Sequence, residues 1–229
     1  ISNPLLDSRY EQINELKNFD SKGNLLLSEN VKAKIPQSTI YGFANNVPIA
    51  SVTDALDTEI AFTSFEGEGN GGFSNFTYTP VQESITGRFS ANVSLSKLGL
   101  NSAKTYTVSL WVKSTIGTTG SVVVNGVSKN VAGEITRNGW HLLTWQVSGT
   151  TGISIVPSSE VLLDEVRIHP KEALMSTVAY QIGVGKISET NANHITTYYE
   201  YDIFNRLKLM RDSFKNIRKF YQYSLQPAN

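Results

Sequence analysis

The sequence predicts an all-β protein with a β-sandwich at its centre, and three observations lead to this fold class. First, residues 105–113 alternate strictly between apolar and mostly polar side chains, a period of two that is typical of a strand with one buried face. The apolar set is Tyr106, Val108, Leu110 and Val112. Second, short strand-like runs follow one another through the middle of the chain without a helical pattern between them, which favours a sandwich over a parallel α/β sheet. Third, Asn125-Gly126 is the dipeptide that a tight hairpin turn prefers.

The amino-acid composition argues against several classes of protein. The chain has 229 residues, with 20 basic and 20 acidic side chains, and it lacks the basic excess expected of a nucleic-acid binder. No run approaches the ~20 apolar residues of a membrane span. Without cysteine, the chain forms no disulfide, thiolate nucleophile or cysteine-ligated zinc site. Because it opens on Ile1 without a signal peptide, we expect a mature product or a piece of a longer protein.

The N-terminal quarter of the chain is expected to form hairpins and loops. Residues 11–20 leave a single short helical turn open as an alternative, because their apolar residues have roughly helical spacing. Strand candidates follow at 25–27 and 34–43, after a turn that contains Gly23. Pro36 and Pro48 bound the second candidate and argue against central-strand positions there.

The middle of the chain contains a glycine-rich stretch and then a series of strands. Residues 67–72 match the G-x-G-x-x-G dinucleotide fingerprint, but the fingerprint requires a helix immediately afterwards. Residues 73–80 are aromatic, β-prone and closed by proline, so an ordinary glycine loop is the favoured interpretation. The expected strands are 87–95, 105–113, 120–124, 127–131, 140–148, 151–156 and 161–168.

The C-terminal part has a different pattern of apolar and polar residues. Residues 171–187 are weakly patterned and are interrupted by Gly183 and Gly185. Beyond them, three alternating segments are expected to be strands, and the tail is rich in tyrosine. These segments are 195–201, 206–211 and 217–223.

The tail resembles the YD repeat of RHS proteins. Residues 199–207 read Y-E-Y-D-I-F-N-R-L, followed by Asp212 and Asn216, against a family pattern of roughly Y-x-Y-D-x-x-G-R-L and D-x-x-G-N. Residues 19–24 are similar to half of another repeat. The chain departs from the pattern at Asn205, which tolerates a left-handed turn position well, and at Lys215, which leaves the turn type there open.

The RHS resemblance implies a context. RHS proteins are large secreted or surface proteins with β-rich repeats. The resemblance therefore implies that the chain is secreted or lies on a bacterial cell surface. Its implied partners are the remainder of a larger parent protein or other cell-surface proteins.

The middle block is similar to jelly-roll carbohydrate-binding modules. Three features carry the resemblance: Phe65-Glu66 before the glycine loop, the strand at 105–113, and the closing L-D-E-V-R-I of residues 163–168. It implies a jelly-roll β-sandwich flanked by YD-repeat-like β-hairpin segments. The domain organisation expected from the two resemblances is 1–55, 56–170 and 171–229, with the jelly roll in the middle.

A glycan or polysaccharide is the expected ligand. If the apolar set of the central strand faces the core, Trp111 points outward beside Ser109 and Lys113, on a face that is concave in jelly rolls. An exposed aromatic ring there can stack on the apolar face of a sugar. The alternative is that Trp111 is covered by a flanking domain or a loop. Trp140 is a second candidate binding aromatic, with an edge position that caps the core as its alternative.

Glu66 and Asp164 are the candidate metal ligands. In related modules, a structural calcium ion lies between the first and last strands, so the resemblance implies Ca²⁺ at these carboxylates, with Glu68 and Glu165 as substitutes. Calcium prefers six to eight oxygen ligands, which two carboxylates, loop carbonyls and water can provide. The alternative is two solvated surface carboxylates.

No catalytic constellation is present. His141, His169 and His194 lack metal-ligand spacing, and no G-x-S-x-G motif occurs. The sequence therefore predicts a non-catalytic, glycan-binding, adhesive module of an RHS/YD-repeat protein. The alternative function is a structural or docking segment of a large bacterial surface or secreted protein without a glycan ligand.

Overall fold

The chain folds almost entirely as antiparallel β-structure. The computed structural model describes residues 11–117, 119–132 and 135–224, in which the elements are strands β1 to β18 and one short 3₁₀ helix, η1 (Asp57–Glu59). No helix in these residues is long and apolar enough to cross a membrane. The all-β prediction is confirmed.

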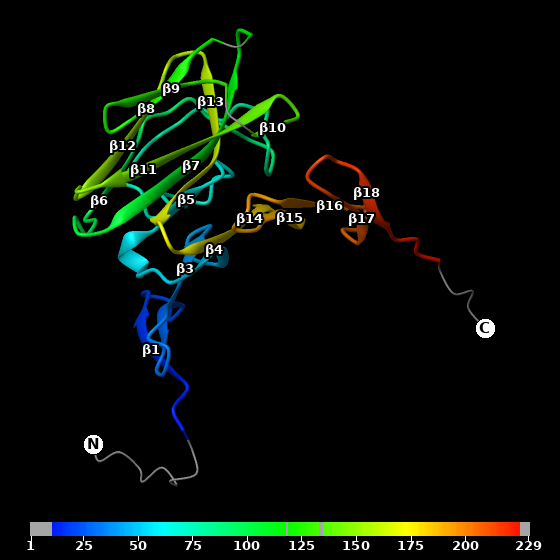
Figure 1. Ribbon diagram of the computed structural model, residues 1–229. Coiled ribbons are helices and arrows are strands. Elements are labelled where there is room, and N and C mark those ends of the chain that lie inside the picture. Colours follow the sequence, from blue (N-terminus) through cyan, green and yellow to red (C-terminus); the bar gives the residue numbers. More distant parts are fainter. Residues whose placement is uncertain (1–10, 118, 133–134, 225–229) are drawn as a thin grey trace.

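One nine-stranded sheet, here called the hairpin sheet, takes strands from both ends of the chain. Its order is β1-β2-β3-β4-β14-β15-β16-β17-β18. The strands are β1 (Asn14–Phe19), β2 (Leu25–Asn30), β3 (Pro36–Gly42), β4 (Val47–Thr53), β14 (Leu174–Gln181), β15 (Gly185–Thr190), β16 (Thr196–Tyr201), β17 (Leu207–Arg211) and β18 (Ile217–Phe220). At its centre β4 pairs directly with β14, from Thr53 opposite Leu174 to Ala50 opposite Thr177. The segment between these two strands, residues 54–173, is inserted into the hairpin sheet (Figure 1).

In the flanks, one open alternative and one expectation are not met, and one segment is more regular than its weak sequence pattern indicated. Residues 11–20 contain strand β1 and no helical turn, because this segment pairs with β2. The weakly patterned segment 171–187 is a hairpin of β14 and β15, with Gly183 in its turn at a φ of +79°. Pro36 and Pro48 both lie in interior strands, contrary to expectation. Pro36 is tolerated as the first residue of β3, and Pro48 because it sits at a register shift near the start of β4.

Four turns of the hairpin sheet share one hydrogen-bonding pattern. They span 20–24, 191–195, 202–206 and 212–216. In each, the side-chain Oδ1 of the first residue, an Asp or Asn, accepts hydrogen bonds from backbone N–H groups two and four residues later. The fourth residue of each turn has a positive φ, and these residues are Gly23, His194, Asn205 and Lys215. Lys215 therefore occupies the same turn type as the others.

The inserted segment forms a β-sandwich of two sheets. One sheet has the order β10-β11-β7-β13-β5 and the other β6-β12-β8-β9. Their strands are β5 (Ala61–Thr63), β6 (Leu95–Leu98), β7 (Thr105–Ser114), β8 (Ser121–Val124), β9 (Val127–Asn130), β10 (Ile135–Arg137), β11 (Trp140–Ser148), β12 (Gly152–Pro157) and β13 (Val161–Pro170). The apolar set of β7 fills the core between the sheets, as the alternation predicted, together with the β11 residues Leu143 and Trp145.

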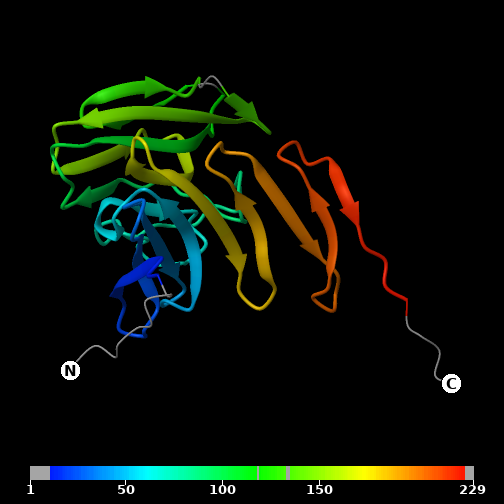
Figure 2. The same cartoon turned by 60° about the horizontal axis from the view of Figure 1, so that its bottom comes forward.

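A second apolar core joins the sandwich to the hairpin sheet. Val52 and Met175 from the hairpin sheet pack against Ile60 and Phe62, all nearly inaccessible to solvent. The sandwich lies against one face of the hairpin sheet at β4 and β14, and the sheet bends away from it on both sides, toward β1 and toward β18 (Figures 1 and 2). The two units are therefore packed together and not merely tethered.

Candidate functional site

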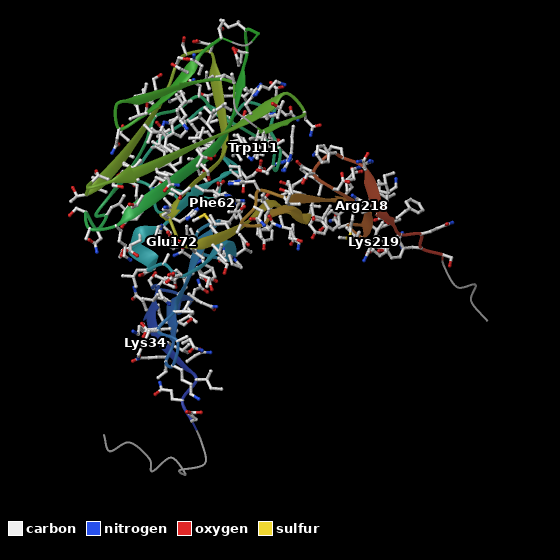
Figure 3. All side chains as sticks on the ribbon, viewed as in Figure 1. Lys34, Phe62, Trp111, Glu172, Arg218 and Lys219 are labelled. Atoms are coloured by element: carbon white, nitrogen blue, oxygen red, sulfur yellow. The ribbon has the colours of Figure 1, made fainter. Side chains whose placement is uncertain are left out.

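Trp111 does not present an exposed ring. Its side chain lies on the face of β7 opposite the sandwich core, as the alternation predicted, but it is 0% exposed. The prediction that the Trp111 ring is exposed is therefore wrong. It packs with Trp140, Leu142, Leu162 and Ile85 in a small separate cluster, and Trp140 is buried too. Figure 3 shows Trp111 within the body of the molecule.

Arg137 covers Trp111 from the side of the hairpin sheet. Its guanidinium carbon lies 5.3 Å from the centroid of the Trp111 ring and 5.8 Å from that of Phe214, in a turn of the hairpin sheet. Its Nη1 donates a hydrogen bond to the backbone carbonyl of His194 in a neighbouring turn. A cation and two hairpin turns therefore cover the face on which a sugar was expected to stack.

Ser109 and Lys113, the two polar residues predicted to flank the ring, are also not available to a ligand. Ser109 is fully buried, and in the described structure neither its Oγ nor the Trp111 Nε1 has a hydrogen-bond partner. Lys113 forms an ion pair with Glu83. The four residues predicted to bind a ligand are brought to one side of the sandwich, but they do not form an open platform there.

Glu66 and Asp164 hold the same loop, residues 85–89, from two sides. Oδ2 of Asp164 accepts hydrogen bonds from the backbone N–H groups of Ile85 and Thr86 at 2.8 and 2.9 Å. Oε1 of Glu66 accepts hydrogen bonds from the N–H groups of Arg88 and Phe89. Burial raises the pKa of both carboxyl groups, and the adjacent Glu165 charge adds to the effect at Asp164.

Backbone N–H groups of this loop already bond both carboxylates, so the loop can be held without a metal ion. A calcium ion at Glu66 and Asp164 stays a prediction. Glu68, one of the suggested substitutes, accepts hydrogen bonds from Ser64 and Phe65 through Oε1, whereas its Oε2 is buried without a hydrogen-bond partner among the described residues. Among the residues that the structure describes, no group of three or more acidic or histidine side chains is placed to hold a metal ion.

Glu165 and Arg167 form the polar joint between sandwich and hairpin sheet. The two side chains are 2% and 1% exposed, with Arg167 Nη2 2.7 Å from Glu165 Oε1. Arg167 also donates hydrogen bonds to the backbone carbonyls of Met175 and Asn191, each at 3.0 Å, and to Thr177 Oγ1 at 2.9 Å. Sequence reasoning treated Glu165 only as a possible calcium ligand and did not single out Arg167. The available signal was an arginine within a strand that is otherwise almost wholly apolar or acidic.

The glycine-rich stretch has a structural role. No helix follows it in the described residues, which confirms that it is not a dinucleotide-binding motif. A Cβ on Gly71 would lie 1.7 Å from the Phe62 carbonyl oxygen, and the same two residues share a backbone hydrogen bond. Glycine is needed at this position because the loop passes directly against strand β5.

A hollow opens on the hairpin sheet, on the opposite side from the sandwich. It has a volume of about 470 Å³ and lies between β4 and β14, with walls from β15 and β16. Ser51, Ser176, Val178, Tyr180 and Glu189 are among its lining residues. It was not predicted, because β14 itself was not recognised.

No family model and no curated protein sequence matches the chain. Among solved structures, the CBM22-1 xylan-binding domain of Xyn10C from Paenibacillus barcinonensis is similar at 17% identity, covering 48% of this chain and 92% of that domain, with a TM-score of 0.33. The tandem CBM22-1–CBM22-2 domain of the same enzyme is similar at 14% identity, covering 65% of this chain and 62% of that one, with a TM-score of 0.29. At these values neither likeness bears on function.

Proposed function

We propose that the chain is a non-catalytic structural and docking segment of a larger, β-rich secreted or cell-surface protein. The observation that supports this most is the direct pairing of β4 with β14 on either side of the inserted sandwich. The hairpin sheet is thereby continuous, with the sandwich as a rigid attachment on one of its faces. The division at residues 1–55, 56–170 and 171–229 is part of this proposal.

Both edges of the hairpin sheet support a docking role. In the described residues, β1 and β18 each pair on one side only, and all their residues are exposed. Leu16 on β1 and Phe220 on β18 are 59% and 60% exposed. An edge strand with unpaired backbone groups and apolar side chains is a template for another strand. The edges would therefore accept strands from the parent protein or from other cell-surface proteins.

Sedimentation velocity of the isolated chain over a range of concentrations tests this proposal. We expect the wild-type chain to self-associate through its edges, and the double variant Leu16→Lys/Phe220→Lys to sediment as a monomer, because lysine on an edge strand opposes pairing. Leu174→Lys is the matched control, since Leu174 is 61% exposed but lies on an interior strand. A wild-type chain that stays monomeric throughout, or a control that dissociates equally, would contradict the docking role.

Glycan binding is the second candidate function. The burial of Trp111 removes the ring platform expected on the sandwich. The hollow in the hairpin sheet instead favours a glycan at a different surface, because it combines hydroxyl groups, a carboxylate and a tyrosine ring.

A further inference from the structure

The hollow lies where the central ladder of the hairpin sheet stops part-way. The pairing of β4 with β14 ends at Ala50 opposite Thr177, although both strands continue beyond this pair. Pro48, which has no backbone N–H to donate, follows on β4, and Val178 and Tyr180 follow on β14. The hollow of about 470 Å³ spans the end of this pairing and continues over β15 and β16, and its volume is within the range of small-ligand sites.

The hollow faces away from the sandwich. Thr177 points toward the sandwich, because its hydroxyl is bonded to Arg167 and Glu165. Successive side chains of a strand point to opposite faces, so Ser176 and Val178 point away from it. This face lies inside the bend of the hairpin sheet, with no described part of the chain covering it (Figures 1 and 2).

We propose that this hollow binds a neutral oligosaccharide. A sugar ring presents apolar C–H faces and a rim of hydroxyl groups, so its site needs apolar surface flanked by hydrogen-bonding side chains. Ser51 and Ser176 lie directly opposite each other across the β4–β14 pair and bring two hydroxyl groups together. On the next strands, Glu189 lies opposite both Val178 and Thr197, so a carboxylate and a third hydroxyl adjoin the apolar Val178 side chain.

The charge in the hollow explains why the ligand is neutral. Glu189 Oε2 lies 2.6 Å from Lys186 Nζ, and its other oxygen accepts a hydrogen bond from the Tyr199 hydroxyl at 2.5 Å. The carboxylate is thus positioned and its charge is balanced within the protein. It can still accept hydrogen bonds from sugar hydroxyl groups, because each carboxylate oxygen has more than one lone pair.

Tyr180 extends the site beyond one sugar ring. It lines this hollow and a neighbouring one of about 300 Å³, which also includes Phe43. The Tyr180 ring packs edge-on against Phe43, with centroids 6.4 Å apart, and this contact fixes its orientation. A linear chain of two or three sugar rings would therefore pass over Tyr180. This proposal rests on the second candidate function, glycan binding at this hollow, and does not depend on the docking role of the sheet edges.

Isothermal titration of the full chain with xylohexaose, cellohexaose, mannohexaose and chitohexaose tests the proposal. We expect at least one of them to bind, and Ser176→Arg to weaken that binding by about tenfold or more by filling the hollow. Ser154→Arg is the matched control, because Ser154 is an exposed serine on a sandwich strand. Glu189→Gln, which keeps the shape of the side chain, should weaken binding by a smaller factor.

Three outcomes would overturn the proposal: no binding of any of the four sugars, unchanged binding by Ser176→Arg, or equal loss in Ser154→Arg. If Ser176→Arg does not fold, as judged by circular dichroism, Thr197→Arg replaces it on the next wall of the hollow. Failure here leaves the sedimentation result on the sheet edges unaffected, so the two proposals are tested separately.

Discussion

At the scale of single residues, the pKa of His194 is lowered where the hairpin sheet packs against the sandwich. His194 occupies the left-handed position of the turn at 191–195, with a φ of +58°. Burial, together with the nearby positive charges of Arg167, His169 and Arg137, lowers the pKa of His194 from 6.5 to about 3. The folded protein therefore holds this imidazole neutral under conditions in which the unfolded chain would protonate it.

This pKa shift predicts acid sensitivity. Because the folded pKa lies below the unfolded one, stability is fully present above the unfolded pKa and is lost as the pH falls toward the folded pKa. Between about pH 7.5 and pH 5 the loss should be ~2 kcal/mol in the free energy of unfolding, measured by urea denaturation. His194→Asn should remove this pH-dependent loss of stability, because asparagine does not titrate and tolerates the left-handed position of the turn. An equal loss in variant and wild type would contradict the assignment, and His169, whose pKa is also lowered, remains in both.

Trp111 shows how far residue-level prediction reaches. Its face of β7 followed from strict alternation, which is a local property of the strand. Its burial did not follow, because the covering groups Ile85 and Arg137 come from distant segments of the chain. Which side of a strand a residue occupies is encoded locally, whereas what lies above it depends on the whole fold.

At the scale of elements, the loop at 85–89 gives a test of the calcium prediction. Asp164 and Glu66 direct their oxygens at four backbone N–H groups of this loop, so the loop should be held without a metal ion. We expect the melting temperature to be the same in calcium and in chelator. Asp164→Ala should instead cost about 3 kcal/mol, because it leaves buried N–H groups without acceptors. A melting temperature that rises with calcium would contradict this account.

The strands and turns differ in how clearly the local sequence predicts them. The strand at 105–113 and the turns at 20–24 and 202–206 carry local signals, namely alternation and an Asp followed by a left-handed residue. Strand β14 was missed because one of its buried residues is Thr177, which is buried by bonding to Arg167 and not by being apolar. Strand β10 was missed because it has three residues, too few to show a period.

At the scale of the whole molecule, the sandwich and the hairpin sheet depend on each other. On the hairpin sheet, Val52 and Met175 are buried because Ile60 and Phe62 of the inserted segment cover them. The sandwich in turn places Glu165 and Arg167 where the hairpin sheet supplies their remaining partners. Apolar and polar contacts at this junction therefore couple the folding of two units that the sequence presents as separate.

This coupling predicts that the chain unfolds as one cooperative unit. Calorimetry should give a single transition in which the calorimetric and van't Hoff enthalpies agree. Arg167→Ala leaves Glu165 buried without a counter-charge and should cost about 3–5 kcal/mol, separating the trace into two transitions. Arg211→Ala is the matched control, because its ion pair with Glu200 is exposed and should contribute at most about 1 kcal/mol. Two transitions in the wild-type chain would show that the sandwich and the hairpin sheet are independent, and the rigid attachment proposed above would then be wrong.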